Sequence, residues 1–162
     1  MADARPAVER RQPPKGPFVV VNALMRAVLA SGRGDPTHGR IALLSFTGRK
    51  SGRRYRTPVG VHDLDGAMVT LTSSGWRKNF RGGAPVTLRR GGTDLALTAT
   101  LTEDPEQVAD TYAALIGRFG HDKAARRLGI RINVDRAPTH DELADAARRS
   151  GLSVVTYQPR AR

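Results

Sequence analysis

Residues 43–61 read LLSFTGRKSGRRYRTPVGV, two runs of apolar and β-branched residues on either side of a turn that contains Gly48, Ser51 and Gly52. Apolar runs of this length bounded by glycine and serine predict a β-hairpin or a tight connection between two strands. The hairpin therefore favours an antiparallel sheet at this point of the chain.

The predicted turn carries a high concentration of positive charge. Five cations fall within eight positions, with no carboxylate among them: Arg49, Lys50, Arg53, Arg54 and Arg56. Self-repulsion on this scale indicates an anion to be bound, and a solvated basic turn is the alternative. If the strand after the turn is extended, Arg54 and Arg56 lie on one face, which can bind an anion, and Tyr55 and Thr57 lie on the other, which packs.

A series of motifs continues from the turn along the chain. Its members are Gly48-Arg49-Lys50-Ser51-Gly52, Thr57-Pro58-Val59, Asp65-Gly66, Ser73-Ser74-Gly75, Trp76 and Asn79. The series resembles the deazaflavin-dependent nitroreductase family, well over about residues 38–103 and loosely in the C-terminal third. The resemblance implies an α+β fold, a split β-barrel related to the FMN-binding pyridoxamine-phosphate oxidases with peripheral helices, and it implies coenzyme F-420 as the cofactor.

Coenzyme F-420 ends in a phosphodiester and a tail of glutamates, so the resemblance implies a basic cofactor site. The anionic end is expected to meet the turn and the strand after it: Arg49, Lys50, Ser51, Gly52, Arg54 and Arg56. Charge-assisted hydrogen bonds from such residues are stronger than neutral ones.

The deazaflavin ring is expected to meet a second set of residues: Pro58, Val59, Thr72, Ser73, Ser74, Trp76 and Asn79. Each has a structural alternative, because a lone tryptophan is often a core residue, paired serines form turns and Asn79 can cap a helical turn. Relatives carry a longer insert before the tryptophan, whereas here Ser74-Gly75 runs directly into Trp76. A short loop predicts a more open pocket.

Composition predicts one domain over residues 17–162, preceded by a disordered basic arm over residues 1–16. Cysteine is absent, which excludes disulfides and thiolate chemistry. The four histidines lack the spacing of a metal site, and none is expected. Without a signal-like segment, the chain is expected to be cytoplasmic.

Short strands with tight turns favour an antiparallel barrel. The predicted strands are 41–46, 55–62, 67–72, 85–89, 93–101 and a final one at 152–157. Helices are predicted from Pro17 to about Ala30, after Asp104, and after the capping box that begins at Thr139.

The sequence predicts an F-420-dependent oxidoreductase that transfers hydride to a quinone, an enone or a nitro compound. FMN as the ligand and a non-catalytic cofactor- or lipid-binding protein are the alternatives. A net charge of +12 makes a nucleic-acid-binding barrel a further alternative. The expected strands lack the interleaved aromatic and basic residues that specific binding of nucleic acid needs. No proton donor is identified; Tyr112 and Tyr157 are candidates by chemistry alone. A homodimer and peripheral contact with an anionic membrane are left open.

Overall fold

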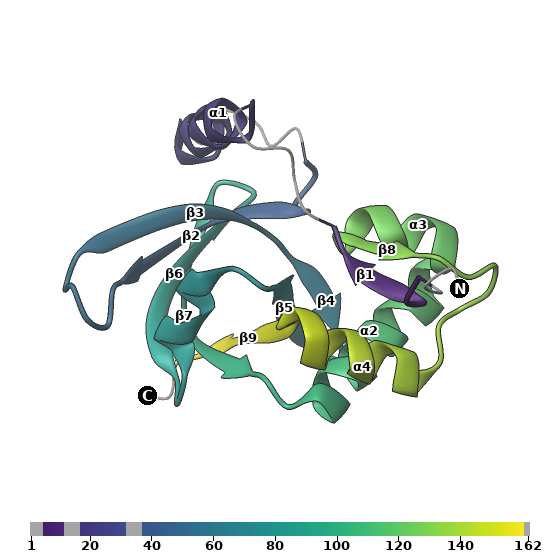
Figure 1. Cartoon of the computed structure of the whole chain (residues 1–162). Helices are drawn as coiled ribbons and strands as arrows, with labels where there is room; N and C mark the ends of the chain where they lie inside the picture. Colours follow the sequence, from purple (N-terminus) through teal and green to yellow (C-terminus); the bar gives the residue numbers. More distant parts are fainter. Residues whose placement is uncertain (1–4, 12–16, 32–36, 161–162) are drawn as a thin grey trace. The chain divides into compact units, whose positions relative to one another are not determined.

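The computed structural model describes residues 5–11, 17–31 and 37–160 (Figure 1). Within the chain, contacts group the residues into two compact units. The first unit comprises residues 1–12, 71–74 and 102–154, and the second comprises residues 13–70, 75–101 and 155–162. Each unit is described by itself below. The expectation of one domain over residues 17–162 stays a prediction.

A seven-stranded sheet forms the centre of the second unit, with strand order β3-β2-β6-β7-β9-β5-β4. Its strands are β2 (Ile41–Thr47), β3 (Arg54–Gly60), β4 (His62–Leu64), β5 (Ala67–Thr72), β6 (Ala84–Arg90), β7 (Thr93–Thr102) and β9 (Ser153–Pro159). The β2–β3, β2–β6, β6–β7 and β4–β5 pairs are antiparallel. Each of the six strands expected from the sequence is therefore present, the one expected over 55–62 as two separate strands.

The connection between β3 and β4 requires the sheet to curl. These two strands are its opposite edges, yet only Val61 separates them along the chain. The expected single strand over 55–62 breaks there because the Val61 amide donates to the carbonyl of Arg40 (2.8 Å), and the chain then changes partner from β2 to β5. The α+β class and the split-barrel sheet are thus confirmed.

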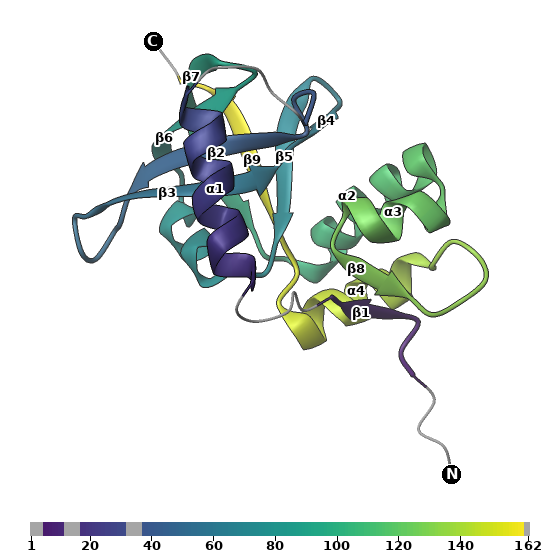
Figure 2. The ribbon, with the colours of Figure 1, turned by 90° about the horizontal axis from the view of Figure 1, so that it is seen from above.

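Alternation along β2 separates a core face from an outer face. Ala42, Leu44 and Phe46 are buried on the core face, where Leu44 lies opposite Leu88 of β6. The outer face is the side that carries Ser45 and Thr47. Helix α1 (Pro17–Ser31) lies against β2, β3 and β6 (Figure 2). None of the described helices is long and apolar enough to span a membrane.

The first unit packs three helices around a small apolar core. They are α2 (Pro105–Phe119), α3 (His121–Arg127) and α4 (His140–Ser150). Asp104 caps α2 by accepting the Gln107 amide, with proline at the first helical position, and Thr139 forms the expected capping box with Glu142.

A two-stranded ribbon completes this unit. Strand β1 (Val8–Arg10) pairs antiparallel with β8 (Ile130–Ile132), and Val8 is fully buried. The expectation of a disordered arm is therefore wrong for these residues of the arm, because pairing with a strand more than a hundred positions away is invisible to local composition. Residues 1–4 and 12–16 of the predicted arm lie outside the described residues.

A histidine that joins α4 to α2 predicts a pH dependence of stability. His140 Nε2 lies 2.8 Å from Asp110 Oδ1, and this hydrogen bond, with the nearby Glu106 carboxylate, raises the pKa of His140 above its usual 6.5. Because the folded state favours the protonated form, the contribution is complete below the unfolded pKa and is lost as the pH rises through the raised one. We expect the thermal midpoint to decrease as the pH rises above 6.5, the usual pKa of histidine, because the protonated form is then lost.

The matched variant is His140→Gln, which keeps a polar side chain without the titration. Its thermal midpoint should change less over the same pH range, measured by circular dichroism. Identical pH profiles for the two proteins would contradict the assigned role of the histidine.

Candidate functional site

The turn between β2 and β3 is held by backbone hydrogen bonds that need glycine. The Gly48 amide donates to the Arg53 carbonyl (2.7 Å), and the Gly52 amide donates back to the Gly48 carbonyl (3.0 Å). Gly52 has a φ of +69°, which lies in the left-handed region. The Ser51 hydroxyl accepts the Arg53 amide (3.2 Å), so the turn has a defined conformation.

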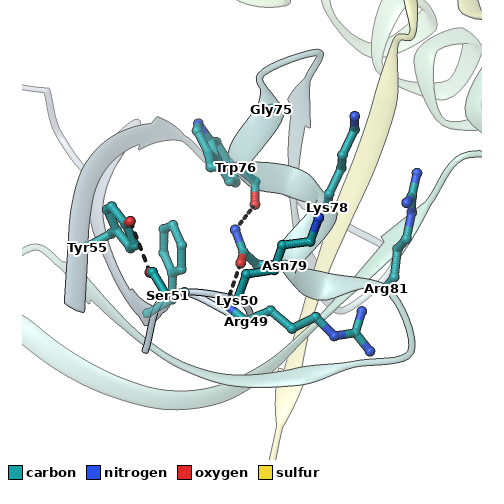
Figure 3. Close-up of a pocket in the computed structure, with 11 residues that line it drawn as sticks. Arg49, Lys50, Ser51, Tyr55, Gly75, Trp76, Lys78, Asn79 and Arg81 are labelled. Atoms are coloured by element: carbon teal, nitrogen blue, oxygen red, sulfur yellow. Dashed lines mark hydrogen bonds between the residues drawn. The ribbon is translucent and has the colours of Figure 1, made fainter. Parts of the chain in front are cut away.

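A short helix, η1 (Gly75–Phe80), is fastened to this turn by one side chain. The Asn79 Oδ1 atom accepts the Arg49 amide (2.8 Å), and its Nδ2 atom donates to the Trp76 carbonyl (2.8 Å) (Figure 3). Asn79 therefore holds the basic turn and the tryptophan helix at a fixed separation.

A pocket of about 520 Å³ lies between the turn and η1. Four of its lining residues are cations and none is a carboxylate: Arg49, Lys50, Lys78 and Arg81. The side chains of Arg49, Lys50 and Lys78 form no ion pair with any described residue. Unpaired charges of one sign around a concave surface attract an anion.

Aromatic rings form one wall of this pocket, which we call the aromatic pocket. The Tyr55 ring stacks on Phe46 at 5.5 Å between centroids and 23° between planes. Phe46 lies 6.2 Å from Trp76, and Trp76 meets Phe80 edge to face at 5.9 Å. Trp76 thus packs on the core and lines the pocket at once, and its contact with the deazaflavin ring stays a prediction.

Two hydroxyl groups face each other at the rim. The Ser51 Oγ and Tyr55 hydroxyl oxygens are 3.2 Å apart, and Tyr55 is 42% exposed. They close over Gly48, where an added Cβ would lie 2.6 Å from Ser51 Oγ and 2.7 Å from Tyr55 Cε2. Only glycine permits this approach.

Part of the set expected from the sequence comes together here: Arg49, Lys50, Ser51, Trp76 and Asn79 all line the aromatic pocket. Gly52 completes the turn without lining it. By contrast, Arg54, Arg56 and Pro58 alternate onto the outer face, opposite Thr47, Ser45 and Leu43. Val59 is buried in the core on the other face.

The serine motif does not line the aromatic pocket. The Thr72 hydroxyl accepts the Ser74 amide (3.0 Å), and the Ser73 hydroxyl accepts a hydrogen bond from Arg10 (3.2 Å). These are turn and ribbon contacts, as the structural alternative for paired serines describes.

Sequence reasoning missed six lining residues: Phe46, Gly48, Tyr55, Gly75, Lys78 and Arg81. A signal for two of them existed. Lys78 lies in η1 and Arg81 directly follows its last residue, Phe80; the Arg81 amide donates to the Lys78 carbonyl (3.4 Å), so these residues three apart lie on one side of the turn. Tyr55 was assigned to packing, and its exposed hydroxyl could not be read from alternation.

The two tyrosines considered as proton donors are buried, and neither lines this pocket. Burial raises the pKa of Tyr112 and of Tyr157 well above the usual value. The Tyr157 hydroxyl donates to Thr70 Oγ1 (3.0 Å), so it completes a buried hydrogen bond. Among the residues described, no three histidine or carboxylate side chains gather to hold a metal ion.

Comparison with known families decides the class of the chain. Residues 20–126, which include the whole aromatic pocket, match the family described as F-420H(2)-dependent quinone reductase. The chain belongs to this family. It is therefore an F-420-dependent reductase, and its cofactor is coenzyme F-420, as the sequence predicts.

Solved structures with similar folds are distant from this reductase. One is described as a domain-swapped dimer (19% identity, 88% of this chain and 100% of that chain, TM-score 0.45). A second is an F-420-H(2)-dependent reductase (17% identity, 74% of this chain and 94% of that chain, TM-score 0.44). A third is a protein of unknown function from Agrobacterium tumefaciens (17% identity, 98% of this chain and 60% of that chain, TM-score 0.47). Among proteins with curated functions, none matches the sequence. Homodimerisation, membrane contact and cytoplasmic localisation stay predictions.

The close approach at Gly48 gives a test of the pocket geometry. We expect Gly48→Ala to displace the Tyr55 ring or Ser51 and to destabilise the reductase by about 1–3 kcal/mol, the usual cost of overpacking. The matched control is Gly75→Ala, since a Cβ at Gly75 meets nothing within 4 Å. Denaturant unfolding gives both values, and equal stabilities of the two variants would contradict the geometry.

Proposed function

We propose that the aromatic pocket binds coenzyme F-420 and that the reductase transfers hydride from the reduced cofactor to a quinone. The observation that carries this proposal is the combination of an aromatic wall with four lining cations and no lining carboxylate. A flat, polyanionic cofactor is the ligand class that such a site suits.

The donor set of the pocket fits the cofactor. The phosphodiester and the glutamates of F-420 need several positive charges, and the pocket supplies them from two sides. Arg49 and Lys50 come from the turn, Lys78 comes from η1, and Arg81 directly follows the last residue of η1 (Figure 3). FMN carries a single phosphate and would leave most of these charges unpaired, so F-420 is the better match.

Each lining group has a role in this proposal. Arg49 and Lys50 bind the phosphodiester through charge-assisted hydrogen bonds. The rings of Phe46, Tyr55 and Trp76 give the deazaflavin an apolar wall that excludes water. Asn79 acts as a positioning residue, because its amide already joins Arg49 to Trp76.

When bound in its reduced form, the deazaflavin supplies a hydride to an electron-poor acceptor. Reduction of a quinone to a hydroquinone consumes that hydride and one proton. The paired hydroxyls of Ser51 and Tyr55 are the protein groups at the pocket rim that can hold and deliver a proton. Enones and nitro compounds accept hydride in the same way and remain the other proposed substrates.

Removal of single cations tests the cofactor site. We expect Arg49→Ala and Lys50→Ala each to weaken F-420 binding by about 1–3 kcal/mol, a rise in Kd of roughly 5- to 150-fold. Lys123→Ala, an exposed cation on α3, is the control and should leave Kd unchanged. Fluorescence titration gives the values, and wild-type affinity in both pocket variants would remove the aromatic pocket as the phosphate site.

Substitution of the wall tests the enzyme class. Trp76→Ala should lower kcat/KM for menadione by about tenfold or more, because the deazaflavin ring loses part of the wall that orients it. Leu24→Ala, at an exposed position of α1, should not. Tight binding of reduced F-420 with no oxidation by quinones, enones or nitroaromatics would instead favour a non-catalytic cofactor-binding protein.

A further inference from the structure

The outer face of the sheet holds a second pocket of about 520 Å³, which we call the arginine pocket. Its lining includes four arginines and one carboxylate, which are Arg54, Arg56, Arg89, Arg160 and Asp94. It meets the aromatic pocket only at the end of the β2–β3 hairpin, where Phe46 and Tyr55 contribute to both.

Strand register brings polar groups of three strands together in this pocket. Ser45 of β2 lies opposite Arg56 of β3 on one side and opposite Thr87 of β6 on the other. In the next row, Thr47 lies opposite Arg54. Directly paired residues of antiparallel strands have Cβ atoms about 5 Å apart, so these groups can bind one small ligand together.

The charges of the arginine pocket are not balanced internally. Asp94 is already paired with Arg89 (3.0 Å), and Arg160 donates to the carbonyls of Val86 (2.9 Å) and Leu97 (3.2 Å). The guanidinium groups of Arg54 and Arg56 have no partner among the described residues. Their positive charges are therefore expected to attract an anion from outside the chain.

Several hydrogen-bonding groups in the arginine pocket also lack partners. The Nε–H of Arg89 is buried and donates to no described acceptor. A buried donor left without an acceptor costs free energy, so an acceptor is expected there. The hydroxyls of Ser45, Thr47 and Thr87 make no hydrogen bond with any residue that the structure describes.

We infer that the arginine pocket is a second anion-binding site, which takes a small molecule through its carboxylate or phosphate oxygens. Arg54 and Arg56 present the planar fork that matches these groups, and the hydroxyls of Ser45 and Thr87 complete the contact. The site is separate from the aromatic pocket, and it rests on the function proposed for that pocket only where its ligand is the tail of the bound cofactor. Its ligand is either an independent metabolite or the glutamate tail of a cofactor whose ring lies elsewhere.

Titration of the full chain with two probes, inorganic pyrophosphate and triglutamate, tests the inference. With the protein labelled with ¹⁵N, we expect saturable shifts of the backbone amides of Ser45, Thr47, Thr87 and Arg89. In the double variant Arg54→Gln/Arg56→Gln, the Kd for the better probe should rise at least about tenfold, since two charge-assisted contacts are lost.

The control double variant is Lys123→Gln/Arg126→Gln, which removes the same charge from the exposed face of α3. Its Kd should stay within about twofold of wild type. Equal weakening in both double variants, or no shifts at the four amides, would overturn the inference. Ser45→Ala is a further variant that leaves all charges in place and should also raise the Kd.

The two probes distinguish the sources of the ligand. Tighter binding of triglutamate indicates that carboxylates occupy the pocket, and tighter binding of pyrophosphate indicates a phosphate ligand. The titration with triglutamate is then repeated in the presence of saturating F-420. A higher apparent Kd for triglutamate indicates that the cofactor tail occupies the arginine pocket, and an unchanged Kd indicates that the ligand is an independent metabolite.

Discussion

Antiparallel pairing of β2 with β3 is the constraint on which both pockets depend. Its register places Phe46 opposite Tyr55 on one face and Ser45 opposite Arg56 on the other. A shift of one residue would move every side chain of β3 to the opposite face. The arginines would then enter the apolar core, and Tyr55 would leave Phe46, so burial and ring stacking together fix the register.

The basic turn is the second consequence of this pairing. Cations crowded into a hairpin repel one another, and the fold offers few carboxylates to relieve them. Asn79 instead fastens the turn to η1 by neutral hydrogen bonds, which add Lys78 and Arg81 to the same concave surface. Stability and function are therefore opposed here. The same cations repel one another in the free protein, which lowers its stability, and attract a polyanion when it binds.

The sequence was sufficient for the hairpin, the approximate ranges of the strands, the capped helices and the family, because these depend on local patterns. It also predicted that Arg54 and Arg56 would share one face. It could not tell which face adjoins the site, because that depends on where η1 packs. For the same reason the sequence predicts only packing for Tyr55, which stacks on Phe46 and also lines the aromatic pocket, whereas Arg56 as a cofactor ligand stays a prediction. Strand β1 was missed because its partner is distant in sequence.

The central claim is that charge in the aromatic pocket binds the anionic end of the cofactor while the rings hold the deazaflavin. The most direct test is the Kd of the wild-type reductase for F-420 and for the same deazaflavin without phosphate and glutamates, each measured as a function of salt. Screening weakens exposed charge interactions as ionic strength rises. Our account predicts a steep loss of F-420 affinity with salt and a weaker, nearly salt-independent affinity for the truncated ring. Equal affinities with the same salt dependence would contradict it.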